Sequence, residues 1–260
     1  MIEFFKKRIS VLSVAVLLAV VGCGGSQRSV AVAPDPVGSG LIHWWKFNGD
    51  SNDAVGGLTA TTQGPVSYTK APTGLGVALN GTTTGISLGP VKDMQFQQSF
   101  TLSAWACLYS YANPNELWSQ IIFDGDDRVG LDPYALQVDP NGNLQFLTTS
   151  SVDAQGANDT TQFPLNKFVL VTGTYDKAVG IQTLYINGKP VSQNLNVFDL
   201  TPVVPLDPSA NPGVGIGTNN DYPNSIYNMG WNGVLSDLRV YNRAISATEV
   251  MEIYKLGGGQ

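Results

Sequence analysis

The sequence predicts an all-β protein, a two-sheet antiparallel sandwich of the jelly-roll kind that ends in one short helix. Three observations support this class. From Leu41 onward, short apolar or alternating runs are separated by Gly, Pro, Asn and Asp, which is typical of strands joined by turns. No helical pattern of any length interrupts these runs. About a dozen strands in one domain favour a sandwich or jelly roll.

Two of the connections between these runs carry clear turn chemistry. The stretch "PNGN" at 140–143 separates two apolar runs, and Asn187-Gly188 accepts positive φ in a type I′ hairpin turn. Residues 195–212 hold four prolines, so we expect a long surface connection there and no strand. The predicted strands cover 41–47, 76–80, 85–89, 99–109, 119–123, 134–138, 143–147, 167–175, 181–187, 213–217 and 233–241.

The chain closes with a strand followed by a helix. In "GVLSDLRVY" strict alternation predicts one face of Val234, Ser236, Leu238 and Val240, and an opposite face of Leu235, Asp237, Arg239 and Tyr241. Ser246 and Glu249 then form a capping box. A helix of about ten residues should follow and end at Gly257-Gly258-Gly259. Its side chains expected against the sandwich are Val250, Ile253 and Tyr254.

Residues 1–23 predict export. A basic segment, 6–8, precedes an apolar run from Ile9 to Val21, which is shorter than the roughly 20 residues of a membrane span and fits a secretory signal. The following "VVGC" resembles the lipobox of bacterial lipoproteins. That resemblance implies a lipidated Cys23 as the first mature residue, and Gly24 implies sorting to the outer membrane. An ordinary signal peptide and an uncleaved anchor are the alternatives.

The expected mature protein is acidic and has one free thiol. Removing residues 1–22 takes away three basic residues and one acidic residue, so the net charge changes from −6 to −8. This argues against nucleic acid and anionic lipid headgroups as partners, and leaves the lipid as the only membrane contact. With Cys23 lipidated, Cys107 has no intrachain partner. The Gly-, Ser- and Pro-rich residues 24–40 predict a flexible tether, and 41–257 form the domain.

Several segments together resemble a known family. They are "LIHWWKFNGDSNDAVGG", "GVALNG", "FTLSAWACL", "VTGTYDKAVGIQTLYINGKPV" and "NGVLSDLRVYNRAISATEV". In this order they resemble the laminin-G-like, concanavalin-A-like jelly rolls of bacterial surface proteins, over roughly 41–256. The resemblance implies two packed antiparallel sheets. It leaves function open, because this fold hosts lectins, adhesion modules, glucanases and polysaccharide lyases.

The sequence lacks the residue patterns that the enzymes of this fold use for catalysis. A glycosidase needs a pair of carboxylic acids across the scissile bond, and glucanases that resemble this chain carry a Glu-x-Asp-x-Glu strand. The glutamates here are Glu3, Glu116, Glu249 and Glu252, and no predicted strand holds two alternating carboxylates. The single histidine, His43, supports no Ser-His-Asp or Cys-His arrangement. We therefore expect a protein without catalytic activity.

A structural calcium ion is the one expected cofactor. The resemblance implies a site between the first and last strands, formed by Asp50, Asp53, Gly81, Ser236 and Asp237. The family usually has Asp where this chain has Ser236, and a hydroxyl is a poor calcium ligand; turn capping is the other role open to Asp50 and Asp53. The alternative site is the acidic stretch with Asp124, Asp126, Asp127 and Asp132, which could equally be a solvated loop.

Aromatic and amide residues in the loops suggest a ligand site. Aromatic rings stack on the apolar faces of sugars, and Asn or Asp bind their hydroxyls. The candidate residues are Tyr109, Tyr111, Trp118, Asn219, Asn220, Asp221, Tyr222 and Tyr227, whose other reading is an ordinary rim of a sandwich. The aromatic residues inside strand patterns are expected in the core, namely Trp45, Phe47, Trp105, Phe168 and Trp231.

The sequence thus predicts a non-catalytic lipoprotein of the cell envelope, in the outer membrane or at the cell surface. Its domain would bind a glycan or a cell-surface protein. A structural or assembly lipoprotein without a glycan ligand is the second reading, and an atypical glycan-cleaving enzyme is the third.

Overall fold

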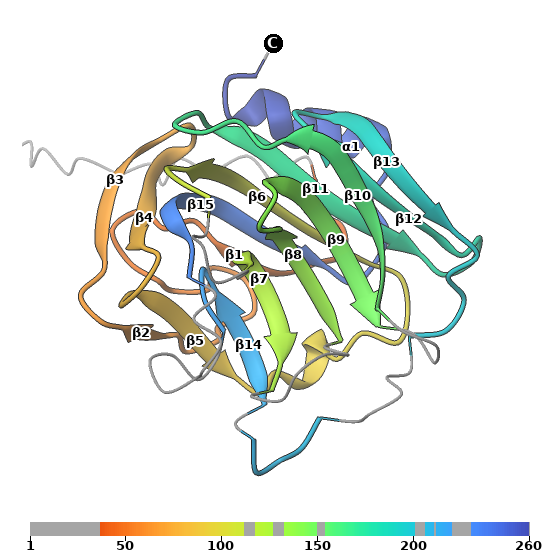
Figure 1. The fold of residues 1–260 in the computed structure, drawn as a ribbon, viewed down its shortest axis with the longest axis horizontal. Coiled ribbons are helices and arrows are strands. Elements are labelled where there is room, and N and C mark those ends of the chain that lie inside the picture. Colours follow the sequence, from red (N-terminus) through yellow and green to blue (C-terminus); the bar gives the residue numbers. More distant parts are fainter. Residues whose placement is uncertain are drawn as a thin grey trace, which may run out of the picture. The chain divides into compact units, whose positions relative to one another are not determined.

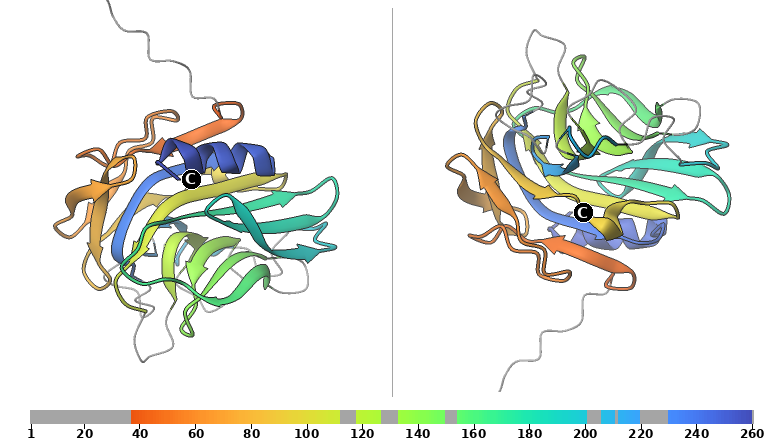
Figure 2. Two further views of the ribbon diagram at one scale, coloured as in Figure 1. Left: turned by 90° about the horizontal axis from the view of Figure 1, so that it is seen from above. Right: turned by 90° about the horizontal axis from the view of Figure 1, so that it is seen from below.

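A computed structural model gives the fold of the chain. It describes residues 37–111, 118–126, 133–149, 154–200, 206–210, 212–219 and 230–259, all within a compact unit that spans 35–260. This unit consists of two antiparallel sheets packed face to face, as predicted (Figures 1 and 2). The lipidation candidate Cys23 lies outside the described residues.

The larger sheet has eight strands in the order β13-β12-β11-β6-β15-β4-β3, and β1 also pairs with β15. The order is non-sequential, which brings the first and last strands of the domain together. The strands are β1 (Leu41–Trp45), β3 (Ser67–Ala71), β4 (Gly74–Asn80), β6 (Phe100–Leu108), β11 (Val169–Asp176), β12 (Ile181–Ile186), β13 (Lys189–Leu195) and β15 (Asn232–Tyr241).

The smaller sheet has seven strands in the order β10-β9-β8-β7-β14-β5-β2. The turn at 139–142 joins β8 to β9, as "PNGN" predicts. A short 3-10 helix, η1 (Lys92–Met94), follows β5. The strands are β2 (Thr61–Gln63), β5 (Gly85–Gly89), β7 (Ser119–Gly125), β8 (Tyr134–Val138), β9 (Asn143–Thr149), β10 (Ala154–Gln162) and β14 (Gly213–Ile216).

The core lies between the two sheets and is rich in aromatic residues. Phe100 of the larger sheet meets Phe146 of the smaller one edge-on, with ring centroids 5.6 Å apart. Trp45, Phe47 and Trp231 are fully buried in the same cluster. The prediction that these three residues belong to the core is confirmed.

A second cluster covers the outer face of the larger sheet. There α1 (Ala247–Leu256) buries Val250 and Ile253 against Trp105 and neighbouring strand residues, and Figure 2 shows the helix lying along that sheet. Tyr254 stacks on Trp105 with ring centroids 5.6 Å apart. The predicted helix, its length and its packing face are confirmed, and Phe168 is only partly buried at this cluster.

The predicted alternation along β15 is wrong beyond Leu235. The register shifts between Ser236 and Arg239, and Asp237 has φ +51°. A bulge adds one residue and turns later side chains to the other face. Leu235, Leu238 and Val240 therefore share the core face, although strict alternation places Leu235 opposite the other two.

Four strands were not predicted: β2, β3, β10 and the hairpin partner β13. The last of these follows the Asn187-Gly188 turn, whose φ values of +50° and +79° confirm the predicted hairpin. Of the predicted strand-free connection 195–212, Leu195 is the last residue of β13, and no other described residue is in a strand. Yet Val197 and Leu200 are buried in the core, so this connection closes one part of the sandwich and does not lie wholly on its surface.

Candidate carbohydrate site

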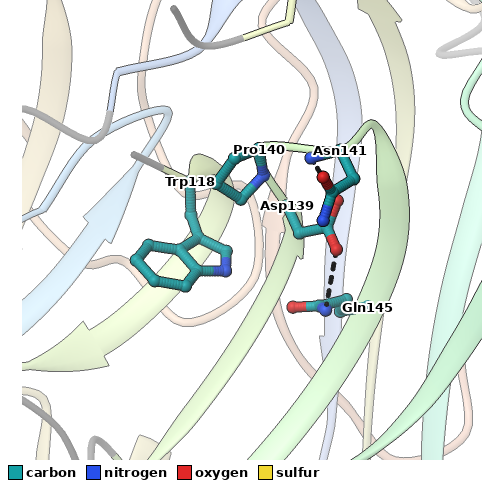
Figure 3. A pocket seen from close by; sticks show the side chains of 5 residues that line it. All are labelled: Trp118, Asp139, Pro140, Asn141 and Gln145. Carbon is teal, nitrogen blue, oxygen red and sulfur yellow. Dashed lines mark hydrogen bonds between the residues drawn. The ribbon is translucent and has the colours of Figure 1, made fainter. Parts of the chain in front are cut away.

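A cavity of about 310 Å³ opens beside the turn that joins β8 to β9. Its described lining consists of Trp118, Asp139, Pro140, Asn141 and Gln145. Figure 3 shows the indole of Trp118 on one side of this hollow and the Asp139–Gln145 pair on the other. The volume lies at the lower end of the range for small-molecule sites, roughly 300–1,000 Å³.

A row of glutamines on three adjacent strands starts at Gln145, which lines this cavity; the other two, Gln120 and Gln137, are buried and are not in its described lining. Gln120 of β7, Gln137 of β8 and Gln145 of β9 are register partners. Their strand neighbours point into the core, so the glutamines point to the outer face of the sheet. Gln120 Nε2 donates to Gln137 Oε1 at 2.6 Å, and Gln137 Nε2 donates to Gln145 Oε1 at 3.0 Å.

The row of amides ends on Asp139. Gln145 Nε2 donates to Asp139 Oδ2 at 3.3 Å, and Asn143 Nδ2 donates to the same oxygen at 3.2 Å. The backbone N–H groups of Asn141 and Asn143 donate to Asp139 Oδ1, each at 2.8 Å. The carboxylate thus fixes both the turn and the orientation of the amides. We call Gln120, Gln137, Gln145 and Asp139 the amide row.

Of the predicted aromatic ligand residues that the structure describes, Trp118 alone lines the cavity. Its side chain is 37% exposed. Tyr111 has a structural role, because its hydroxyl donates to the carbonyl of Phe163 at 2.6 Å and its ring packs over Gly142. Tyr109 is 45% exposed and is absent from the described lining.

The other predicted ligand residues are not part of this cavity as described. Asn219 is 5% exposed and is not in the described lining. Asn220, Asp221, Tyr222 and Tyr227 lie outside the described residues. Their role in ligand binding stays a prediction.

The candidate calcium residues near the chain ends occupy separate places. Gly81 follows Asn80, which pairs with Asn232 at the start of β15. Ser236 lies four residues further along that strand, about 13 Å away at 3.3 Å per residue. Its hydroxyl donates to the carbonyl of Leu75.

Asp53 and the Oδ1 atom of Asp237 accept hydrogen bonds from the protein itself. Asp53 forms a backbone bridge with Trp45 on the edge of β1 that faces away from β15. Its carboxylate accepts hydrogen bonds from the backbone N–H groups of residues 44, 55, 56 and 58. Asp237 Oδ1 accepts from Trp44 Nε1 at 2.5 Å and from Arg239 Nε at 3.1 Å. Asp50 is exposed and caps the turn at Asn52.

The alternative calcium set is only partly described, since Asp127 and Asp132 lie outside the described residues. Asp124 is 3% exposed, and burial raises the pKa of its carboxyl to about 7. Asp126 Oδ2 accepts from the N–H of Asp207 at 2.8 Å. The described residues contain no group of three or more His, Cys, Asp or Glu side chains arranged to hold a metal. Calcium binding stays a prediction.

His43 is buried, with its side chain 1% exposed. Its Nδ1 lies 2.7 Å from Asp53 Oδ2, and its Nε2 lies 3.3 Å from Asp93 Oδ1 of η1. The imidazole therefore links β1, the loop after it and the 3-10 helix. These contacts give His43 a structural role.

The comparisons with known proteins agree with this architecture. The model of the concanavalin A-like lectin/glucanases superfamily matches residues 80–251. The chain belongs to this superfamily. A search of the curated proteins gives no match. In the described part of this superfamily member, no helix is both long and apolar enough to cross a membrane.

Solved structures of the same fold include domain 4 of an extracellular arabinanase from Geobacillus stearothermophilus, in complex with arabinotriose. It is 20% identical with a TM-score of 0.61, over 82% of this chain and 98% of that domain. The binding domain of botulinum neurotoxin DC in complex with SialylT is 13% identical with a TM-score of 0.60, over 84% of this chain. This chain spans about half of that toxin domain, 51%.

A third similar structure is the Trypanosoma rangeli sialidase, which is 16% identical with a TM-score of 0.54, over 83% of this chain and 32% of the sialidase. At these identities the likeness shows the shared fold alone. The superfamily contains both binding domains and enzymes, so function has to be argued from the site.

Proposed function

We propose that this superfamily member is a non-catalytic, lipid-anchored protein of the cell envelope whose domain binds carbohydrate at the cavity beside Trp118. The observation that carries the proposal is an exposed indole that shares one hollow with the polar side chains of Asp139, Asn141 and Gln145. An aromatic face stacks on the C–H face of a sugar ring, and amides bind its hydroxyls. Sugar ligands in two of the similar structures, arabinotriose and SialylT, support this reading.

The described carboxylates do not form a catalytic pair at the cavity. Asp139 is the one carboxylate of the described lining, and its oxygens already accept four N–H donors. Asp124 lies on β7 between Val214 and Tyr134, both core residues, so it faces the interior of the sandwich. Glycoside hydrolysis needs two carboxyl groups on either side of the scissile bond. We therefore expect no hydrolysis or elimination of glycans.

A glycan array tests the proposal on the full-length protein in neutral detergent. Trp118→Ala should lower affinity for the bound glycans at least tenfold, because it removes the stacking surface. Tyr109→Ala is the matched control, since it removes an exposed aromatic side chain that does not line the cavity. Absence of binding to every glycan would favour an assembly role in the envelope, and reducing-end release from a bound glycan would show an enzyme.

A further inference from the structure

The described lining of the cavity carries a negatively charged side chain and no positively charged one. Asp139 supplies one carboxylate, and the other lining residues, Trp118, Pro140, Asn141 and Gln145, are neutral. No Lys, Arg or His side chain is among these described residues. A ligand in the hollow therefore meets an anion without a compensating cation from this part of the wall.

The turn surrounds the carboxylate of Asp139 with N–H donors. Its two oxygens accept from the N–H groups of Asn141, Asn143 and Gln145, at distances from 2.8 to 3.3 Å. Asp139 is the acceptor in all four hydrogen bonds, which suits an ionised carboxylate because that group can only accept. Bonds of this kind are stronger when the acceptor is charged. The negative charge is thus part of how the turn is built.

The nearby amides are fixed in the orientation that serves Asp139. Gln145 donates to Asp139 and accepts from Gln137, which accepts in turn from Gln120. Turning these amides so that their N–H groups face a bound anion would break the bonds along the whole row, because each amide positions the next. An amide group as a whole both donates and accepts, which suits a sugar hydroxyl.

We infer that the cavity selects neutral glycans and discriminates against sialylated and uronic-acid glycans. This inference rests on the proposed function and adds the class of ligand. A ligand carboxylate in the hollow would face the like charge of Asp139 where protein partly replaces water, and like charges repel more strongly there than in bulk solvent. Specificity then comes from a repulsive element as well as an attractive one.

The experiment compares glycans that differ only in charge, by calorimetry on the full-length protein in neutral detergent. The pairs are sialyllactose methyl ester with sialyllactose, and methyl-esterified with free oligogalacturonate; arabinotriose is a further neutral probe. The acidic member of each pair should bind at least tenfold more weakly. Raising the salt concentration should narrow the difference, because salt screens charge repulsion, and should leave the neutral affinity unchanged.

Single-residue variants test whether the carboxylate of Asp139 is the charge that weakens the binding of acidic glycans. Asp139→Asn should raise the affinity for the acidic glycans towards that for the neutral ones. Asp176→Asn is the control, because it removes one carboxylate that likewise accepts an N–H bond in a turn, here from Ala178, and it should leave the difference intact. Trp118→Ala should weaken every glycan. If Asp139→Asn does not fold, the salt dependence of the wild-type protein decides.

The outcomes separate the two proposals. Acidic glycans that bind as tightly as their neutral partners, or whose affinity falls with added salt, would overturn the inference and leave carbohydrate binding in place. Failure of every neutral and acidic glycan to bind would overturn the proposed function together with the inference.

Discussion

At the scale of single residues, Asp53 organises the loop that follows β1. Its Oδ1 accepts from the N–H groups of Trp44, Val55 and Gly56, and its Oδ2 faces His43 Nδ1 at 2.7 Å and the N–H of Leu58. The side chain is buried. Several backbone donors therefore depend on one carboxylate, and a methyl group in its place would leave them without an acceptor.

Asp53→Ala should lower the free energy of unfolding by about 3 kcal/mol, because buried donors lose an ionised acceptor. Urea unfolding followed by tryptophan fluorescence measures it. Asp50→Ala is the control: Asp50 is exposed and caps a single N–H, so its loss should cost about 0.5 kcal/mol. If calcium binds at this loop, a chelator should lower the melting temperature of the wild-type protein and Asp53→Ala should abolish that shift; an unchanged melting temperature would exclude calcium here.

The same residue predicts a dependence on pH. Burial alone would raise the pKa of the Asp53 carboxyl, but hydrogen bonds from Trp44, His43, Val55 and Leu58 outweigh burial, and its pKa lies below 3.8. A carboxyl with a depressed pKa stabilises the fold fully above its unfolded pKa, and this contribution is lost as pH falls through the folded pKa. The difference in unfolding free energy between the wild-type protein and Asp53→Ala should therefore be smaller in strong acid than at neutral pH.

At the scale of elements, α1 depends on its first turn. Ser246 and Glu249 form the predicted capping box, in which Glu249 Oε2 accepts from the N–H of Ser246 at 2.8 Å. Arg243 adds two hydrogen bonds to the same carboxylate. The bond with Arg243 is the main reason that the pKa of Glu249 falls to about 2.

Glu249→Gln should destabilise the protein by about 1 kcal/mol at neutral pH, because Gln can keep the capping bond to Ser246 but loses the charge that pairs with Arg243. The depressed pKa means that the carboxylate stabilises the fold above pH 4.5 and that this stabilisation is lost as pH falls towards 2. Thermal unfolding between pH 2 and pH 7 measures it. Glu252→Gln removes the same charge from the same helix without a capping partner, and an equal loss there would contradict the role given to Glu249.

Strand patterns show how far the sequence predicts these elements. Apolar strands and the capped helix were predictable, because their side chains pack in a regular period. The polar strand β10, "AQGANDTTQ", was not, since β9 determines its place by backbone pairing. The bulge at Asp237 was also missed; the Trp44 and Arg239 side chains that bind its carboxylate come together only in the fold.

The amide row was visible in the sequence but was not recognised. Each of the runs "SQIIF", "YALQV" and "NLQFL" holds one glutamine among apolar residues, which points to the outer face if the strand is half-buried. Only the register brings Gln120, Gln137 and Gln145 into one line. Asp139 was not singled out, since the turn was predicted from residues 140–143, and its position beside Trp118 depends on the fold.

At the scale of the whole molecule, the sheets are joined by a polar bridge as well as by the apolar core. Gln182 of β12 is fully buried, and its Nε2 donates to Thr148 Oγ1 of β9 at 2.6 Å. Asn194 in turn donates to Gln182 Oε1. When a buried amide N–H loses its acceptor, the loss of folding free energy exceeds the net contribution of the hydrogen bond, because the N–H stays buried and unpaired.

Thr148→Val should destabilise the protein by about 2 kcal/mol, because it keeps the shape of the side chain and removes the acceptor of a buried N–H. Thr160→Val on β10 is the matched control, since Thr160 is exposed, and it should change stability by less than about 0.5 kcal/mol. Equal urea midpoints for Thr148→Val and the wild-type protein would show that the bridge between the sheets contributes nothing.

The proposed attachment of the protein to a membrane would depend on Cys23, which lies outside the described residues. An apolar run that ends in "VVGC" predicts lipidation there, and acyl chains contribute about 0.8 kcal/mol for each buried methylene. Cys23→Ser should abolish palmitate labelling and leave the protein unprocessed or released from the membrane fraction. Cys107→Ser is the control, because Cys107 is buried in β6, and it should keep both labelling and membrane attachment. Palmitate labelling of Cys23→Ser at the wild-type level would exclude the lipid anchor.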